Sequence, residues 1–320
     1  LLAGWLIALG THLSAVWIIV ANGFMQHPVG YVLRNNRAEL VNFWEVLFNP
    51  YAWYTYIHTL FACYSVGAFF VLAVSAYHLL RKRNVEMMQI CIKIATVFAI
   101  ISTLGNAITG HFNGKNVALR QPTKLAAMES LWETGTNVPM PLIVIPDAAN
   151  ERNAVEALKI PGLTSWLSYG RTDAEVMGLK DIPPAERPPV GLTFWSFRIM
   201  VGLGLLMLAL AVLAWWHNRK GTIMERRTLL KLLLWSIPLP YIATNLGWMV
   251  AEVGRQPWTV YGLISTADSV SPVALSDVII SLGLVVVFYA ILVGLDAYLL
   301  VRYAKAGPEA YDERQAAVAD

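Results

Sequence analysis

Six stretches of this chain run for about twenty residues or more with almost no charge, and this pattern constrains the fold more than any other feature. They cover residues 1–22, 53–80, 89–110, 193–216, 229–251 and 274–301. A bilayer core about 30 Å thick requires about 20 mainly apolar residues in a helix. Charged residues make up only 14% of the chain, whereas a soluble domain carries about 25%. The sequence therefore predicts an all-α, polytopic membrane helix bundle and excludes a soluble enzyme.

Basic residues gather in three of the segments that flank these spans. The three segments are 81–83, 219–227 and 302–305. Short cytoplasmic connections are enriched in Lys and Arg, so we expect all three on the inner side. Alternation of the spans then places residues 23–52, 112–192 and 252–273 outside. The net charge of +3 is too small to indicate nucleic-acid binding.

The chain is expected to divide into four parts. Residues 1–111 hold three transmembrane helices, 112–192 form an extracytoplasmic loop, 193–303 hold three more helices and 304–320 form a cytoplasmic tail. A loop of about eighty residues is uncommon without a function, so it is a candidate binding element.

Two local patterns refine this division. Residues 122–133 carry apolar side chains at helical spacing, which predicts a short amphipathic helix in the loop. Pro238 and Pro240 lie inside the fifth span and predict a bend there, because proline removes a backbone hydrogen bond.

His58 and Met200 are the first pair of residues that could carry chemistry. Each lies a few residues inside the outer end of its span, in the second and fourth spans respectively. A His and a Met at matched depth can ligate one haem iron from opposite faces. The alternative is that Met200 fills a gap in the packing and that His58 hydrogen-bonds to a neighbouring helix.

Three more charged residues lie inside spans or at their ends. Arg198 needs an anion such as a haem propionate, unless its long side chain snorkels to the outer surface. Glu252 could ligate iron or pair with Arg255, three positions further on.

The loop helix and the first span add further candidates. Glu129 and Glu133 are four residues apart with Lys124 upstream, so a carboxylate and an amine could receive a proton and bind a carbonyl. A solvated helix face explains the same spacing. In the first span, Ser14 belongs to a polar stripe that could conduct protons or hydrogen-bond between helices.

Several strings together resemble one known family. They are LSAVWI at 13–18, VANGFMQ at 20–26, KLAA at 124–127 followed by Glu129 and WET at 132–134, FRIM at 197–200, and GRQPW at 254–258. In this order they resemble subunit I of the cytochrome bd-type quinol oxidases, over nearly the whole chain. The loop between Lys124 and Met200 is similar to that of the short-loop members.

The resemblance implies a role for each candidate residue. His58 and Met200 would ligate the iron of a low-spin haem b, with Arg198 close to it. Glu252 would ligate a high-spin haem b, with Arg255 beside the second haem pair. Lys124 and Glu129 would belong to the quinol-binding loop, and Ser14 would lie on a proton route.

The implied activity is oxidation of quinol at the outer face of the bacterial cytoplasmic membrane. Haem b and haem d would carry electrons to O2, and a proton motive force would arise without pumping. The implied partners are a second membrane subunit and a small single-span subunit. Two alternatives remain open: a quinone-linked cytochrome b that does not reduce oxygen, and a transporter.

One departure from the family pattern concerns the start of the chain. The family's first three helices, with a histidine and two glutamates, are absent before Leu1. The sequence therefore reads as a fragment that would not hold a complete oxygen-reducing site by itself and would be inactive alone.

Overall fold

The computed structural model describes residues 2–35 and 37–308, and most of them are helical. Within these residues, five helices are long and apolar enough to cross a membrane, and a bent pair of helices adds a sixth candidate. The five are α1 (Leu2–Gln26), α3 (Pro50–Leu80), α4 (Val85–Arg120), α7 (Val190–Arg219) and α10 (Leu275–Ala306). The bent pair is α8 (Arg227–Leu234) and α9 (Pro238–Val253). The predicted all-α membrane fold is confirmed.

The fifth span is broken where the prolines predict a bend. The axes of α8 and α9 meet at 42°, and Pro238 occupies the first turn of α9. The fixed backbone angle of proline suits the start of a helix, and its missing N–H is not needed there.

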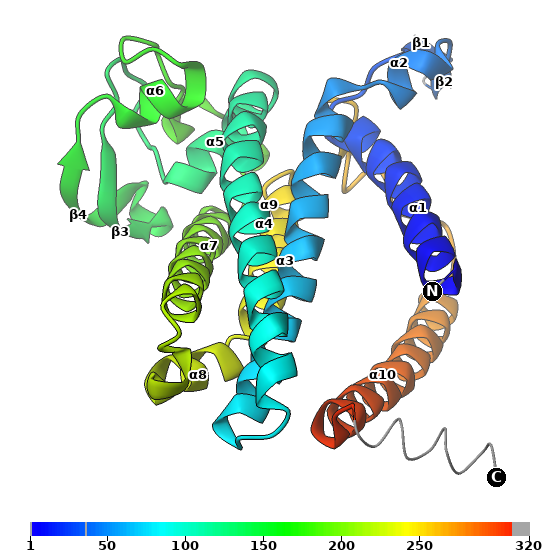
Figure 1. The fold of residues 1–320 in the computed structure, drawn as a ribbon. Coiled ribbons are helices and arrows are strands. Elements are labelled where there is room, and N and C mark those ends of the chain that lie inside the picture. The colour runs from blue at the N-terminus through cyan, green and yellow to red at the C-terminus, as the bar shows by residue number, and fades with distance from the viewer. Residues whose placement is uncertain (1, 36, 309–320) are drawn as a thin grey trace.

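The core lies between α3, α4, α7 and α8. Its buried side chains mix large and small residues, with Phe69, Leu72 and Ile92 fully enclosed beside Ala76, Ala99 and Ala211. Small side chains allow helix backbones to approach closely, which is how membrane helices gain packing energy. By contrast, α10 has no buried residue and stands apart from this core in Figure 1. A contact between His78 Nε2 and the Ala304 carbonyl, at 2.8 Å, holds its end.

The basic connections between the helices lie together at one end of the bundle. In Figure 1 the α3–α4 and α7–α8 connections and the C-terminal end of α10 lie at one end, and helices α5 and α6 lie at the opposite end. The three basic segments are thus on the same side, as the topology requires. The direction of the bundle in the membrane remains a prediction.

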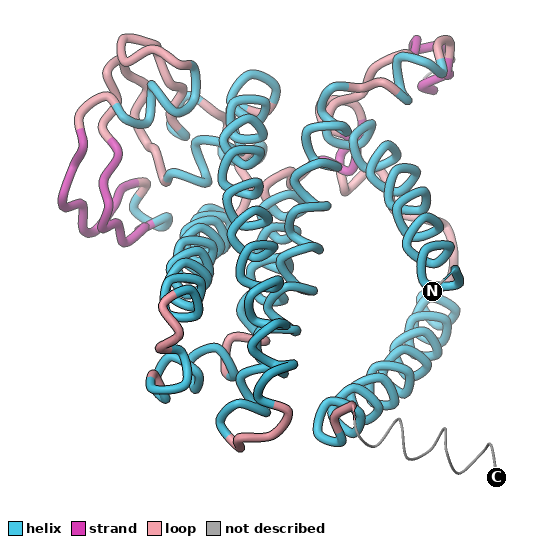
Figure 2. Tube along the Cα trace, in the orientation of Figure 1, coloured by secondary structure: helices cyan, strands magenta, loops and turns pink. Residues whose placement is uncertain are grey.

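The loop region contains structure that the sequence did not reveal. Figure 2 shows strands at this end of the molecule, where only loop and one helix were expected. They form three antiparallel pairs: β1 (Tyr31–Arg34) with β2 (Arg37–Leu40), β3 (Met140–Asp147) with β4 (Arg152–Ile160), and β5 (Trp258–Val260) with β6 (Ile264–Ser265). The same end of the molecule also holds the short helices α2 (Phe43–Leu47), α5 (Pro122–Glu129) and α6 (Leu163–Tyr169).

Helix boundaries differ from the expected ones at two places. The helix α4 continues to Arg120, so the first nine residues of the expected loop 112–192 are helical. Tyr169 of α6 donates a hydrogen bond to the Ala118 carbonyl and packs against this extension. At the tail, α10 continues to Ala306, and residues 309–320 lie outside the described part of the chain.

The loop helix is shorter than expected. α5 ends at Glu129, because Ser130 takes a left-handed conformation with φ 51°. The expectation that Glu129 and Glu133 share one helix face is therefore wrong. Glu133 instead pairs with Lys180 at the surface, while Glu129 is buried.

Candidate functional site at the loop end of the bundle

Two ionisable side chains of α5 are buried. Lys124 is 1% exposed and Glu129 is 8% exposed. α5 begins with Pro122 in its first turn and packs against α7 and the end of α4. Burying a charged group is costly unless it is paired and hydrogen-bonded. Each side chain therefore needs a partner, and the structure gives them different ones.

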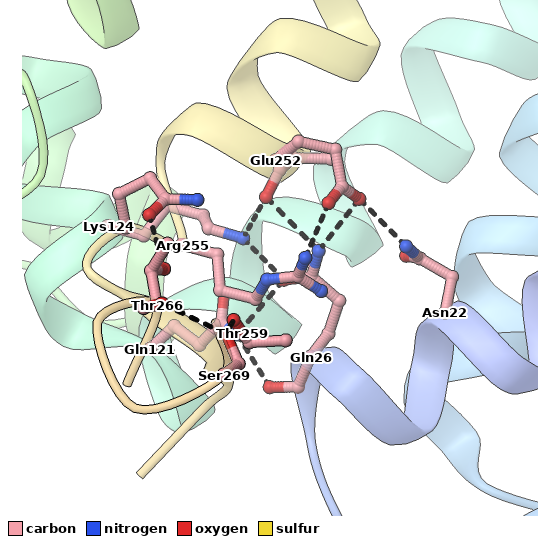
Figure 3. Close-up of polar contacts among 11 residues, drawn as sticks. Asn22, Gln26, Gln121, Lys124, Glu252, Arg255, Thr259, Thr266 and Ser269 are labelled. Carbon is pink, nitrogen blue, oxygen red and sulfur yellow. Dashed lines mark hydrogen bonds and ion pairs between the residues drawn. The ribbon is translucent and has the colours of Figure 1, made fainter. Parts of the chain in front are cut away.

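Lys124 points into a polar cluster formed by the ends of α1 and α9. Its Nζ lies 2.7 Å from Gln26 Oε1 and 2.9 Å from the Ala251 carbonyl oxygen. Figure 3 shows the amine between these elements. Burial lowers the pKa of Lys124 to about 7; Glu252 counteracts the shift and Arg255 adds to it. The amine can therefore gain or lose a proton near neutral pH.

Glu252 is the second member of this cluster. Its Oε1 accepts hydrogen bonds from Asn22 Nδ2 at 2.7 Å and from Gln26 Nε2 at 3.3 Å. Its Oε2 lies 2.6 Å from Arg255 Nη2. The pairing of Glu252 with Arg255, one of the two possibilities raised by the sequence, is thus present. A carboxylate offers about four lone-pair positions, so one remains for a metal ion.

Glu129 and Arg198 form an ion pair between the loop and the membrane span. Arg198 Nη2 lies 2.7 Å from Glu129 Oε2, and its guanidinium group lies over the ring of Phe194. Burial raises the pKa of Glu129, while the charge and hydrogen bond of Arg198 lower it. The sequence predicted that Arg198 either pairs with a haem propionate or extends to the outer surface. In the structure, the Glu129 carboxylate of the loop helix is a third partner.

His58 and Met200 face different neighbours. His58 Nδ1 lies 3.0 Å from Thr109 Oγ1 of α4, whereas a Cβ on Gly247 of α9 would lie 3.2 Å from the Met200 sulfur. No contact joins the two side chains among the residues that the structure describes. Their shared ligation of one iron therefore stays a prediction.

The residues at this end of the bundle fit haem in two respects. A hydrogen bond at Nδ1 of His58 orients the ring and leaves Nε2 for an iron. In the described chain, Nε of Arg198 and both Nε and Nη1 of Arg255 are buried without a hydrogen-bond partner. Such donors suit an anionic group such as a propionate.

Gln26, at the centre of the polar cluster, was not predicted as a site residue, and the predicted residue Ser14 lies outside the cluster. Gln26 is 1% exposed and touches both Lys124 and Glu252. Its signal is an amide side chain at the end of an apolar span, where burial demands hydrogen bonds. Ser14 is exposed on α1 and belongs to neither polar group.

Comparison with known proteins identifies relatives along almost the whole chain. A family model described as cytochrome bd terminal oxidase subunit I matches residues 1–308. The cytochrome bd ubiquinol oxidase subunit 1 of Bacillus subtilis (strain 168) is 37% identical over 316 residues, which are 95% of this chain and 67% of that protein. The cytochrome bd-II ubiquinol oxidase subunit 1 of Escherichia coli (strain K12) is 33% identical, over 98% of this chain and 74% of its own length.

A solved structure has the same fold. The bd oxidase from Geobacillus thermodenitrificans superposes with a TM-score of 0.84 and 31% sequence identity, covering 94% of this chain and 69% of that one. The resemblance carried by the sequence motifs is therefore confirmed.

Proposed function

The chain belongs to the family of subunit I of the cytochrome bd terminal oxidases, and on that premise we propose that it oxidises quinol at the outer membrane face and directs the electrons to O2. Family membership makes it a haem-containing oxidoreductase of a bacterial membrane and implies a second subunit. Water as the product, and a proton motive force without pumping, belong to the proposal.

The proposal assigns each candidate residue a task. His58 and Met200 would hold a low-spin haem b, Glu252 a high-spin haem b, and a haem d would complete the set. Bound haem supplies one-electron transfer and the reduction of oxygen. Arg198 and Arg255 would offer N–H groups to the propionates, and Ser14 would lie on the proton route.

The quinol site of the proposal lies at α5. Glu129 accepts a proton from the quinol hydroxyl, and burial favours its protonated form because it raises its pKa. Lys124 hydrogen-bonds the ring oxygen, with its amine buried where it can change protonation near neutral pH. Protons leave on the outer side and are taken up from the inner side.

One observation supports this reading above the others. The Glu129–Arg198 ion pair joins the loop helix to α7, two residues from Met200. A group that receives a quinol proton is thereby connected to the helix that carries a proposed iron ligand. Neither a solvated helix face nor a transporter requires such a link.

The test compares haem content in the complex purified from membranes, using His58→Ala and a matched control, His111→Ala. His111 lies near the outer end of α4 and stacks on Trp166. Reduced-minus-oxidised spectra should show loss of one b-type haem in His58→Ala and none in His111→Ala. Oxygen uptake with reduced quinol should accompany haem d absorption in the unaltered complex. Full haem content in His58→Ala contradicts the ligand assignment, and b-type haem without oxygen uptake favours the quinone-linked cytochrome b.

A further inference from the structure

Gln26, the last residue of α1, uses both ends of its side-chain amide. Its Oε1 accepts hydrogen bonds from Lys124 Nζ at 2.7 Å and from Gln121 Nε2 at 3.1 Å. Its Nε2 donates to the Ala251 carbonyl at 3.1 Å and to Glu252 Oε1 at 3.3 Å. In Figure 3 the side chain lies between the lysine of the loop helix and the carboxylate at the end of α9.

An amide suits this place because its two neighbours have opposite requirements. A protonated lysine can only donate hydrogen bonds, and an ionised carboxylate can only accept them. The two neighbours therefore also determine which way the amide of Gln26 points. A buried carboxylate at position 26 would repel Glu252, and a buried ammonium group would repel Lys124.

We propose that Gln26 is a positioning residue that holds the Lys124 amine and the Glu252 carboxylate at a fixed separation. The inference rests on the proposed function, which makes Lys124 a quinol-binding group and Glu252 an iron ligand. The oxygen of the Gln26 amide positions the quinol side, and its nitrogen positions the haem side. Gln26 thus joins the two sites through one uncharged side chain.

Lys124 and Glu252 differ in how many other hydrogen-bond partners they have. Glu252 also contacts Asn22 and Arg255, so it keeps two partners when the amide is removed. Lys124 keeps only the Ala251 carbonyl, among its hydrogen bonds within the described residues. Loss of the amide should therefore affect quinol binding more than the haem ligand.

Two substitutions at position 26, tested in the purified complex, distinguish the effect of the amide on Lys124 from its effect on Glu252. Gln26→Met removes both ends of the amide while keeping a similar length. Gln26→Glu retains an acceptor for Lys124 but replaces the donor that faces Glu252 with a negative charge. The measurements are the quinol KM, kcat, and the absorption spectrum of the high-spin haem with and without cyanide.

Gln26→Met should raise the quinol KM about tenfold or more, as expected for the loss of a hydrogen bond to a charged group. It should also shift the high-spin haem spectrum slightly. Gln26→Glu should keep the quinol KM near the unaltered value and shift the spectrum more strongly.

Asn49→Ala is the control for simple loosening of the end of α1. Asn49 is fully buried, and its Nδ2 donates to the Gly23 and His27 carbonyls and not to Gln26, Lys124 or Glu252. It should lower the apparent melting temperature and leave the quinol KM and the haem spectrum unchanged.

Three results would overturn the inference while leaving the proposed function intact. They are a Gln26→Met complex with unaltered KM and spectrum, equal rises in KM for Gln26→Met and Gln26→Glu, and the same changes in Asn49→Ala. An unaltered complex without haem or quinol oxidation would instead reject the proposed function, and with it this inference.

Discussion

At the scale of single residues, burial acts in opposite directions on the two ionisable groups of α5. It lowers the pKa of Lys124 and raises that of Glu129, because it disfavours the charged form of each. Both groups are thereby brought closer to neutral pH, where a proton acceptor or donor is most useful. Arg198 limits the shift of Glu129 by pairing with it.

The acid limb of the pH–rate profile should belong to Glu129. Its pKa is raised from 4.5, so the carboxylate that accepts the quinol proton is lost as pH falls through the raised value. Quinol oxidation should decline there, and Glu129→Gln should lower the rate and remove this limb. The measurement is the initial rate of quinol oxidation against pH. An unchanged acid limb in Glu129→Gln would show that another group receives the proton.

Lys124 should make stability depend on pH. Its pKa is about 7 in the folded chain and 10.5 without burial, so the unfolded state binds more protons in this window. The free energy of unfolding then rises as pH increases from about 7 to 10.5. Apparent melting temperatures should follow this rise, and Lys124→Met should flatten it. Lys180→Met, which changes an exposed lysine, should retain it, and equal slopes in all three proteins would contradict the prediction.

At the scale of elements, the β3–β4 hairpin supports the end of α5. Asn153 of β4 accepts hydrogen bonds from Ser130 Oγ at 2.6 Å and Trp132 Nε1 at 3.2 Å, and its Nδ2 donates to the Ser130 carbonyl at 3.0 Å. Ser130 directly follows Glu129. The hairpin thus holds the residue at which α5 ends, and with it the buried carboxylate.

Asn153→Ala should therefore loosen the loop helix without disturbing the spans. We expect a severalfold rise in the quinol KM, consistent with the loss of hydrogen bonds worth about 1 kcal/mol each, and an unchanged haem content. Steady-state kinetics and a pyridine haemochrome assay measure these quantities. Asn150 lies in the same hairpin but hydrogen-bonds only to Asp147 within the described chain. The quinol KM of the Asn150→Ala control should therefore stay unaltered. A loss of haem in Asn153→Ala would count against this role.

At the scale of the whole molecule, charge and apolar surface determine how the bundle lies in the membrane. The basic segments share one end, and the loop helices and hairpins share the other. The polar contacts of Lys124 and the ion pair of Glu129 lie with the loop helix α5 at this second end. Quinol oxidation at the outer face then requires that the basic end faces the cytoplasm.

Thiol labelling in spheroplasts tests this direction. With Cys63 and Cys91 replaced by Ala, we introduce Arg83→Cys at the basic end and Arg171→Cys in the loop, both at exposed positions. A membrane-impermeant maleimide should label position 171 at once and position 83 only after the membrane is opened. The opposite order would reverse the topology and place the quinol site inside.

Much of the fold could be predicted from the sequence because it depends on local properties. The transfer of an apolar segment into lipid is nearly a sum over its residues, so the spans could be located without knowing their neighbours. The bend before Pro238 and the start of α5 at Pro122 follow from the fixed angle of proline. The end of α5 was misplaced, since apolar spacing continued beyond Ser130 although its backbone turns there.

The site could be predicted only in part. Lys124, Glu252 and Arg255 meet in one polar cluster, and Glu129 and Arg198 form a separate ion pair. Their pairing was not predictable, because Arg198 meets Glu129 across 69 positions and Gln26 meets Lys124 across 98. The meeting of His58 and Met200 on one iron stays a prediction.

The amino-acid sequence alone determined that this protein is a bundle of membrane helices with a long loop, and its motifs indicated the family. Hydrophobic length, basic segments and prolines act through solvent and local backbone geometry, so they can be read one segment at a time. Only the tertiary structure decided that Lys124 joins Glu252 through Gln26 and that Glu129 pairs with Arg198. A buried polar group takes whichever partner packing brings within hydrogen-bond distance, and that distance is a property of the assembled helices.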